Sequence, residues 1–135
     1  MSQENVEVAR ALYNEFSEGR FGTSEHLFDP DVEYERKRKT ADVMSGKWCG
    51  LEAMGAAVRE WLETVEGLRI EAERYIDTGD DSIVVFTRHR AIAKTSGVPI
   101  DEEFADVLTV REGRIVRLHT YRHRSEALEA VGLRE

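Results

Sequence analysis

The chain places its helical patterns in the first half and its strand patterns in the second, and this order limits the folds available to it. Apolar side chains recur at three- and four-residue steps over residues 6–16 and 51–66, which predicts two amphipathic helices that end at Gly19 and Gly67. Residues 68–122 then carry only alternating, β-rich patterns separated by turns. Helices followed by mostly antiparallel strands indicate an α+β fold.

Shorter elements complete the expected order. A short helix is predicted around "TSEHLFD", because proline disfavours helix in the residue before it and Pro30 follows. The stretch "DVEYE" alternates as a strand, residues 36–50 are interpreted as a loop, and "SEALEAV" forms a closing helix. Helices laid on one face of a curved sheet of four to six strands would leave a cavity where the sheet bends away from them.

Composition restricts the partners. At 135 residues the chain has the length of one domain, so we expect a single domain over 1–135. The net charge of −8 argues against nucleic acid and anionic membranes, and a small-molecule ligand is expected instead. Cys49 is the only cysteine, so no intrachain disulfide forms. The charged start and the lack of a long apolar run favour a cytoplasmic protein.

Asp106 is the most informative single residue. In "EEFADVLTV" it falls on the same strand face as Phe104, Leu108 and Val110. An unpaired charge on an apolar face is costly, so the carboxyl group must be paired, protonated or next to a wet cavity. We favour the cavity, while an ion pair with Arg88 or Arg122 is the competing interpretation.

The turn after this strand decides which residue lies opposite Asp106, because a one-residue change of register reverses every side chain on the returning strand. A two-residue loop of Glu112 and Gly113 places Asp106 opposite His119. A three-residue loop that starts at Arg111 places it opposite Leu118 instead. We favour the second, since Val116, Leu118 and Thr120 make the better apolar inner face.

The same reasoning assigns side chains to the inner face elsewhere. If Val84 and Phe86 point inward, Arg88 and Arg90 follow them, and Arg36 follows Tyr34 on the first strand. Guanidinium groups match carboxylates and enolate-like oxygens, so we expect an anionic or strongly polarised oxygen ligand. The histidines lack the spacing of metal ligands, and no metal site is expected; they are His26, His89, His119 and His123.

Three stretches carry a family resemblance: "ALYNEFSEGRF", "LFDPDVEYE" and "FADVLTVREGRIVRLHTYRHRSEALEAVGL". Their order and spacing resemble the SnoaL-like branch of the superfamily that includes ketosteroid isomerase and nuclear transport factor two. The resemblance implies a cone-shaped α+β half-barrel, in which three N-terminal and central helices pack on the concave face of a curved, mostly antiparallel sheet and a short helix follows at the C-terminus. It also implies an apolar pocket without a cofactor and a homodimer joined through the outer face of the sheet.

The resemblance suggests roles for individual residues. Tyr13 and Asp106 match the positions whose side chains together hydrogen-bond the oxyanion in ketosteroid isomerases, whereas the position of the catalytic base is occupied here by Arg36. We expect Tyr13 and Asp106 to be catalytic. The expected ligand-binding residues are Tyr34, Arg36, Met54, Trp61, Phe86, Arg88, Phe104 and Leu118.

Two functions follow as hypotheses. The first is an isomerase, cyclase or dehydratase that uses Asp106 as general acid or base and Tyr13 as oxyanion donor. The second is a non-catalytic module that binds a hydrophobic acid in the same pocket, which the arginine at the base position favours. A dimerisation domain with a filled core is a third and weaker alternative.

Overall fold

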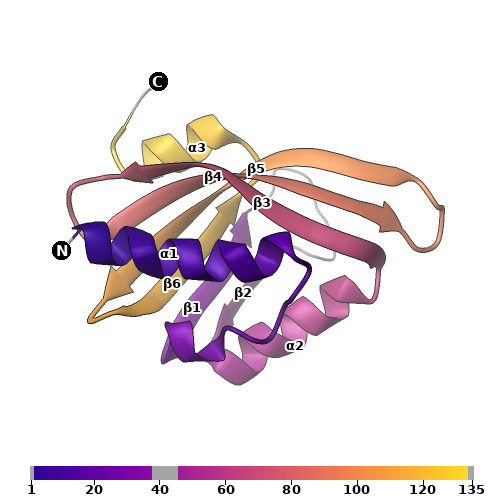
Figure 1. Ribbon diagram of the computed structural model, residues 1–135, viewed down its shortest axis with the longest axis horizontal. Helices are drawn as coiled ribbons and strands as arrows, with labels where there is room; N and C mark the ends of the chain where they lie inside the picture. The colour runs from indigo at the N-terminus through magenta and orange to yellow at the C-terminus, as the bar shows by residue number, and fades with distance from the viewer. Residues whose placement is uncertain (1, 38–45, 134–135) are drawn as a thin grey trace.

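The computed structural model describes residues 2–37 and 46–133, and it confirms the α+β fold with two amphipathic helices before most of the strands (Figure 1). The expected second helix is a single 3₁₀ turn. The expected loop over 36–50 is wrong for residues 36–37, which end the first strand, and for residues 46–49, which form a short edge strand. Residues 38–45 of that loop lie outside the described residues. The elements are α1 (Ser2–Ser17), η1 (Glu25–Leu27), β1 (Phe28–Lys37), β2 (Gly46–Cys49), α2 (Leu51–Leu62), β3 (Val65–Asp77), β4 (Ser82–Ala93), β5 (Pro99–Arg111), β6 (Arg114–Tyr121) and α3 (Arg124–Ala130).

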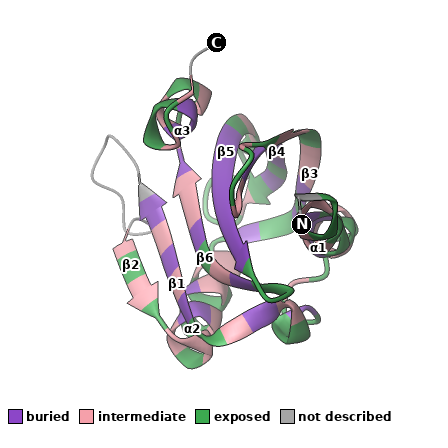
Figure 2. Ribbon diagram, turned by 90° about the vertical axis from the view of Figure 1, so that its left-hand side faces the viewer, coloured by how far each residue is buried: buried purple, intermediate pink, exposed green. Residues whose placement is uncertain are grey.

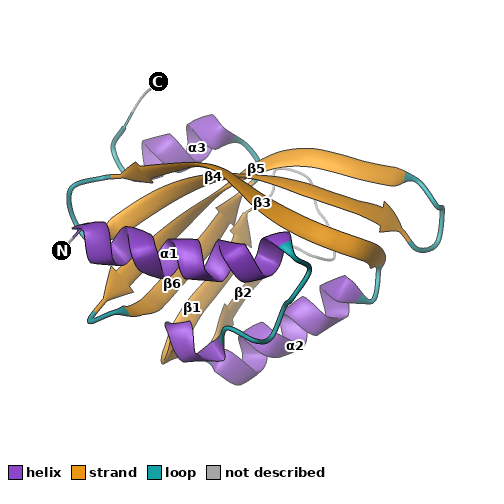
Figure 3. Ribbon diagram, viewed as in Figure 1, coloured by secondary structure: helices purple, strands orange, loops and turns teal. Residues whose placement is uncertain are grey.

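The six strands form one curved, unclosed sheet in the order β2-β1-β6-β5-β4-β3. Every neighbouring pair is antiparallel except β1 and β6, which run parallel. Register shifts interrupt β3 twice along its pairing with β4, and such irregularities increase the local bend of a strand. Figure 3 shows the long β3, β4 and β5 curving past α1, while α2 lies across the end of the sheet formed by β1 and β2.

The two faces of the sheet carry separate apolar clusters. The larger one joins α1 and α2 to the inner face, where Leu12 meets Ile83, Val85 and Leu108. The smaller one lies on the outer face, where α3 packs its Leu128 among strand residues. Since both faces are covered, the second half of β5 is buried without interruption, as Figure 2 shows. A strand that is covered on both faces loses the alternation from which its orientation could be read.

This double burial explains one wrong prediction. Val84 and Phe86 point to the outer cluster, and the inward residues of β4 are Ile83, Val85 and Ala91. Val84 and Phe86 therefore lie on the side opposite to the expected one, and the arginines of β4 follow them outward.

The β5–β6 turn also differs from the prediction. Glu112 and Gly113 alone form the loop, both with positive φ, so the three-residue loop is wrong. A bulge then adds one residue, Val116, so that Asp106 lies opposite Thr120 rather than Leu118 or His119. The shorter turn and the extra residue each reverse the direction in which the β6 side chains point, so together they leave it unchanged. Leu118 therefore still points inward as expected. Within the described residues, no helix is long and apolar enough to cross a membrane.

Candidate ligand pocket with a buried carboxyl group

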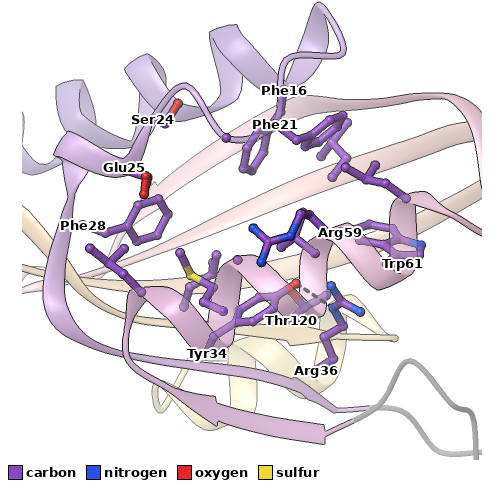
Figure 4. A pocket seen from close by; sticks show the side chains of 18 of the residues that line it. Phe16, Phe21, Ser24, Glu25, Phe28, Tyr34, Arg36, Arg59, Trp61 and Thr120 are labelled. Atoms are coloured by element: carbon purple, nitrogen blue, oxygen red, sulfur yellow. Dashed lines mark hydrogen bonds between the residues drawn. The ribbon is translucent and has the colours of Figure 1, made fainter.

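A pocket of about 640 Å³ lies between α2, the segment that joins α1 to β1, and the inner face of the sheet (Figure 4). Apolar and aromatic side chains form most of its wall, and a few charged groups interrupt them. The lining residues are Phe16, Phe21, Gly22, Ser24, Glu25, Phe28, Tyr34, Arg36, Leu51, Glu52, Met54, Gly55, Val58, Arg59, Trp61, Leu62, Ile70, His89, Asp106, Leu118 and Thr120. This is the usual construction of a small-molecule site.

Three polar residues of this wall lie in one row across the sheet. Arg36 of β1 is paired with Thr120 of β6, and Thr120 is paired with Asp106 of β5. With neighbouring strands about 4.8 Å apart, the arginine and the carboxyl group start from backbone positions roughly 10 Å apart, with the threonine between them. The row therefore presents a cation and a carboxyl group to the same part of the pocket.

The Asp106 carboxyl group is 5% exposed and held by two hydroxyl groups. Tyr13 donates a hydrogen bond to Oδ2, and Thr120 donates one to Oδ1 at 2.7 Å. Burial raises the pKa of Asp106 from 3.8 to about 6, although both hydrogen bonds and the positive charge of Arg36 act in the opposite direction. A carboxyl group with this pKa can hold or release a proton near neutral pH.

Tyr13 reaches Asp106 from α1 but is not part of the pocket wall. Its ring is buried against Phe16 and Tyr75, with ring centroids 5.7 Å and 6.3 Å away. Burial, followed by the nearby carboxyl group, raises the pKa of Tyr13 well above its usual value, so the phenol stays protonated. The family resemblance implied that Tyr13 lies near Asp106, and it does, but the Tyr13 hydroxyl donates to the carboxyl group instead of pointing into the pocket.

Arg36 is 4% exposed and surrounded by aromatic rings. Its Nε donates to the Tyr34 hydroxyl at 2.6 Å, as the dashed line in Figure 4 marks. Its guanidinium carbon lies 4.5 Å from the ring centroid of Trp61 and 5.5 Å from that of Trp48. The hydrogen bond and the neighbouring rings restrict the orientation of this planar cation.

Most of the expected ligand-binding residues do line the pocket, namely Tyr34, Arg36, Met54, Trp61 and Leu118. Phe104 is buried behind the wall, where its ring lies 4.2 Å from that of His89. Whether any of these residues binds a ligand stays a prediction.

Phe86 and Arg88 do not face the pocket, and their expected placement is wrong. Phe86 belongs to the outer cluster under α3. Arg88 donates to Glu73, Asp101 and Glu103 at 2.9–3.0 Å on the outer face. An arginine that already holds three carboxylates on the convex side cannot serve a ligand on the concave side. The same pairs show that Arg88 does not neutralise Asp106.

His89 is a pocket residue that sequence reasoning missed. It is buried, and its ring lies 5.6 Å from that of Trp61 on the pocket side and against Phe104 behind it. The sequence does contain an indication of this placement, because neighbouring strand residues point to opposite faces and an inward His89 puts Arg88 and Arg90 on the outer face. Two guanidinium groups are more costly to bury than one imidazole.

The described residues bring three potential metal ligands together on the other face of the sheet, where donor atoms of Glu33, Glu35 and His119 lie within 4.8 Å of one another. Glu33 already accepts a contact from His119 Nε2 at 2.7 Å and lies 3.6 Å from both Lys47 and Arg117. The His119 contact, with the nearby cations, lowers the pKa of Glu33. This group is an ion-pair network, and it belongs to the surface opposite the pocket.

Solved structures share this fold. TerC, co-crystallised with polyporic acid, superposes with a TM-score of 0.77 at 20% identity, over 95% of this chain and 98% of the other. A protein from Catenulispora acidiphila with a ketosteroid isomerase-like fold, in complex with trimethylamine, gives a TM-score of 0.71 at 18% identity over 94% and 93%. A putative SnoaL-like polyketide cyclase from a Jannaschia species gives 0.75 at 17% identity over 96% and 92%.

These identities are low, so the superpositions show a common fold and leave activity open. A search of curated proteins finds no match. The family model of the SnoaL-like domain, by contrast, matches residues 9–118, which include part of α1, the strands β1 to β5, α2, and the pocket residues Arg36 and Asp106. On this match and the cone-shaped α+β architecture, the chain belongs to the SnoaL-like family.

Proposed function

We propose that the protein is a small-molecule enzyme of the isomerase or cyclase type, in which Asp106 removes a proton from a carbon atom next to a carbonyl group of the substrate. One observation carries the proposal: a buried carboxyl group with a pKa of about 6 shares a pocket wall with a buried arginine, in one row across three strands. A base near its pKa and a cation beside it are what such a proton transfer requires.

The step balances without any other reactant. The C–H bond breaks, its proton moves to the Asp106 carboxylate, and its electron pair forms a carbon–carbon double bond. The carbonyl oxygen becomes an enolate oxygen, which the guanidinium of Arg36 stabilises. Return of the proton to a different carbon gives an isomerase. Attack of the enolate carbon on a second carbonyl carbon of the same substrate gives a cyclase, in which the π electrons of that carbonyl group move to its oxygen and this oxygen takes the proton from Asp106. Proton transfer of this kind typically contributes on the order of 10² to 10⁴ in rate.

Tyr13 and Thr120 act as positioning residues in this proposal. Each donates to one oxygen of Asp106, which fixes the plane of the carboxyl group. A carboxylate oxygen has two lone pairs, so each oxygen keeps one for a substrate proton. Thr120 lies between Asp106 and Arg36 and also lines the pocket.

The comparisons support a ligand pocket of this type. One protein with this fold was crystallised with polyporic acid, and another is described as a putative SnoaL-like polyketide cyclase. Both share less than a quarter of their residues with this chain, so they support the class of function and leave the substrate open.

The proposal is tested with 2-tetralone, a flat ketone with acidic hydrogens next to its carbonyl group. Exchange of these hydrogens in deuterium oxide is followed by NMR with the wild-type protein and with Asp106→Asn, which keeps the shape of the side chain. We expect the wild-type protein to accelerate exchange and the variant to lose at least about 100-fold of that acceleration. Equal exchange by both proteins excludes Asp106 as the base.

A non-catalytic binding module is the second candidate, and one observation favours it. Both oxygens of Asp106 already accept hydrogen bonds, from Tyr13 and Thr120, as in a carboxyl group that only organises a pocket. This candidate predicts that 2-tetralone quenches the tryptophan fluorescence with similar affinity in the wild-type protein and in Asp106→Asn, while neither protein accelerates exchange.

A further inference from the structure

A second arginine stands at the pocket and was not expected from the sequence. Arg59 lies on α2, three residues before its end, and the pocket wall includes it together with Gly55 and Val58 of the same helix. Arg36 is buried at the sheet, whereas Arg59 is exposed to solvent, so Arg59 marks the mouth of the pocket. Figure 4 shows its side chain pointing into the pocket.

The guanidinium of Arg59 has no ion pair or hydrogen bond to any residue that the structure describes. Several other arginines of this acidic chain are held by carboxylates: Arg88 contacts three, and Arg124 contacts Glu73 and Glu103. The donors of Arg59 are therefore available to a molecule inside the pocket. A guanidinium group presents a planar fork that fits a carboxylate or a similar anion.

Gly55 leaves the space that this side chain occupies. It lies in the middle of α2, where glycine is the least favourable residue after proline. A methyl group at this position would lie 3.3 Å from Nη1 of Arg59, which is closer than ordinary contact. The helix thus lacks a side chain where the guanidinium folds back over it.

We propose that Arg59 binds an anionic group at the pocket mouth, so that the ligand is an elongated molecule with an aromatic or polycyclic body and a terminal carboxylate or comparable acid. This inference rests on the proposed function, because the other end of the ligand carries the carbonyl group that reaches Arg36 and Asp106. Glu25 and Glu52 also line the pocket. Glu52 is seven residues from Arg59, about 10 Å along the helix, so these carboxylates repel an anion that is not aligned with Arg59.

Two matched probes separate the charge from the aromatic body: 1-anilinonaphthalene-8-sulfonate, which is anionic, and N-phenyl-1-naphthylamine, which is its neutral counterpart. Fluorescence titrations give the Kd of each for the wild-type protein, for Arg59→Met, which keeps the apolar stem, and for Gly55→Ala. Arg114→Met is the control, because Arg114 is exposed at the distant β5–β6 turn and its loss changes the net charge equally.

We expect Arg59→Met to raise the Kd of the anionic probe by about threefold to tenfold and to leave the Kd of the neutral probe unchanged. Gly55→Ala should weaken the anionic probe in the same direction without lowering the Tm, while Arg114→Met changes neither Kd. If Arg59→Met changes the Kd of both probes equally, or of neither, the proposed role of Arg59 is wrong. Such a result would not contradict the pocket, because the wild-type protein still binds the probes. If the wild-type protein binds neither probe, the proposed ligand pocket fails together with this inference.

Discussion

Asp106 is controlled by groups that act against each other. Burial favours its neutral form, whereas the hydroxyl groups of Tyr13 and Thr120 and the charge of Arg36 favour the carboxylate. The result is a pKa of about 6, which is close enough to neutral pH for a proton to be taken up and returned. Each of these groups can be removed singly, and the direction of the pKa change then identifies its part.

Tyr13→Phe removes one hydrogen bond to the carboxylate and leaves the ring in place. The pKa of Asp106 should therefore rise by roughly one unit above its value of about 6 in the intact protein. In the 2-tetralone assay, the rate rises with pH as the base ionises, and its midpoint should shift upward by the same amount. Tyr75→Phe is the control, because Tyr75 contacts the Tyr13 ring at 6.3 Å but does not contact Asp106. An unchanged or lower midpoint in Tyr13→Phe would contradict this account.

At the scale of the elements, the sequence predicts the inward face of β5 but not that of β4. Asp106 shares its strand face with apolar neighbours such as Leu108, which indicates the core side, whereas its proximity to Tyr13 was implied only by the family resemblance. β4 has apolar residues on both faces, since α3 covers the outer one. Because both faces of β4 are apolar, the alternation of side chains does not distinguish the inner face from the outer one. The prediction for Phe86 and Arg88 is therefore wrong, and it misses His89.

The β5–β6 hairpin shows a second limit. The turn holds Glu112 at φ 52°, a left-handed conformation that favours glycine or asparagine, and the bulge at Val116 follows within three residues. Neither departure can be recognised from local preferences, because the register is set by burial of Ile115 and Leu118 in the core. Long-range packing therefore sets the register of the hairpin, and the turn takes the conformation that this register requires.

Glu112→Asn therefore tests the hairpin. Asparagine tolerates positive φ better than glutamate, and Asn-Gly is the preferred pair for a two-residue turn of this type. We expect the free energy of unfolding to rise by about 0.5 to 1 kcal/mol, as measured by urea denaturation at neutral pH. Glu66→Asn is the control, because Glu66 is exposed within β3 rather than in the turn and its replacement removes the same charge. A loss of stability in Glu112→Asn would show that the turn conformation is different.

At the scale of the whole molecule, the fold could be predicted because it depends on the order of the elements, and the sequence displays that order directly. The pocket mouth could not be predicted. Phe21, Arg59 and Ile70 come from three separate segments, and only the packed chain brings them together. The homodimer that the resemblance implies stays a prediction.

The ionisable groups of the whole molecule set its response to pH. Glu33 and Glu73 have lowered pKa values, because His119 and the arginines at positions 88 and 124 hold them, so the stability that they contribute is lost as the pH falls below about 4.5. Asp106 has a pKa raised from 3.8 to about 6, so the stability it contributes is present below 3.8 and is lost as the pH rises through 6. The contribution of Glu33 and Glu73 grows with rising pH, whereas that of Asp106 falls, so the free energy of unfolding is largest where the two changes balance.

We therefore expect the free energy of unfolding to be largest between about pH 4 and pH 5. Ionisation of buried Asp106 should lower it by about 3 kcal/mol in total as the pH rises from below 3.8 to above 6, with roughly half of this loss above pH 5, since one pKa unit corresponds to about 1.4 kcal/mol. Urea denaturation between pH 4 and pH 8 measures the curve, and Asp106→Asn should remove the decline above pH 5 because the amide does not ionise. A wild-type curve that rises steadily to pH 8, or one parallel to that of the variant, would mean that Asp106 is already ionised at low pH and lacks the raised pKa on which its role as a base depends.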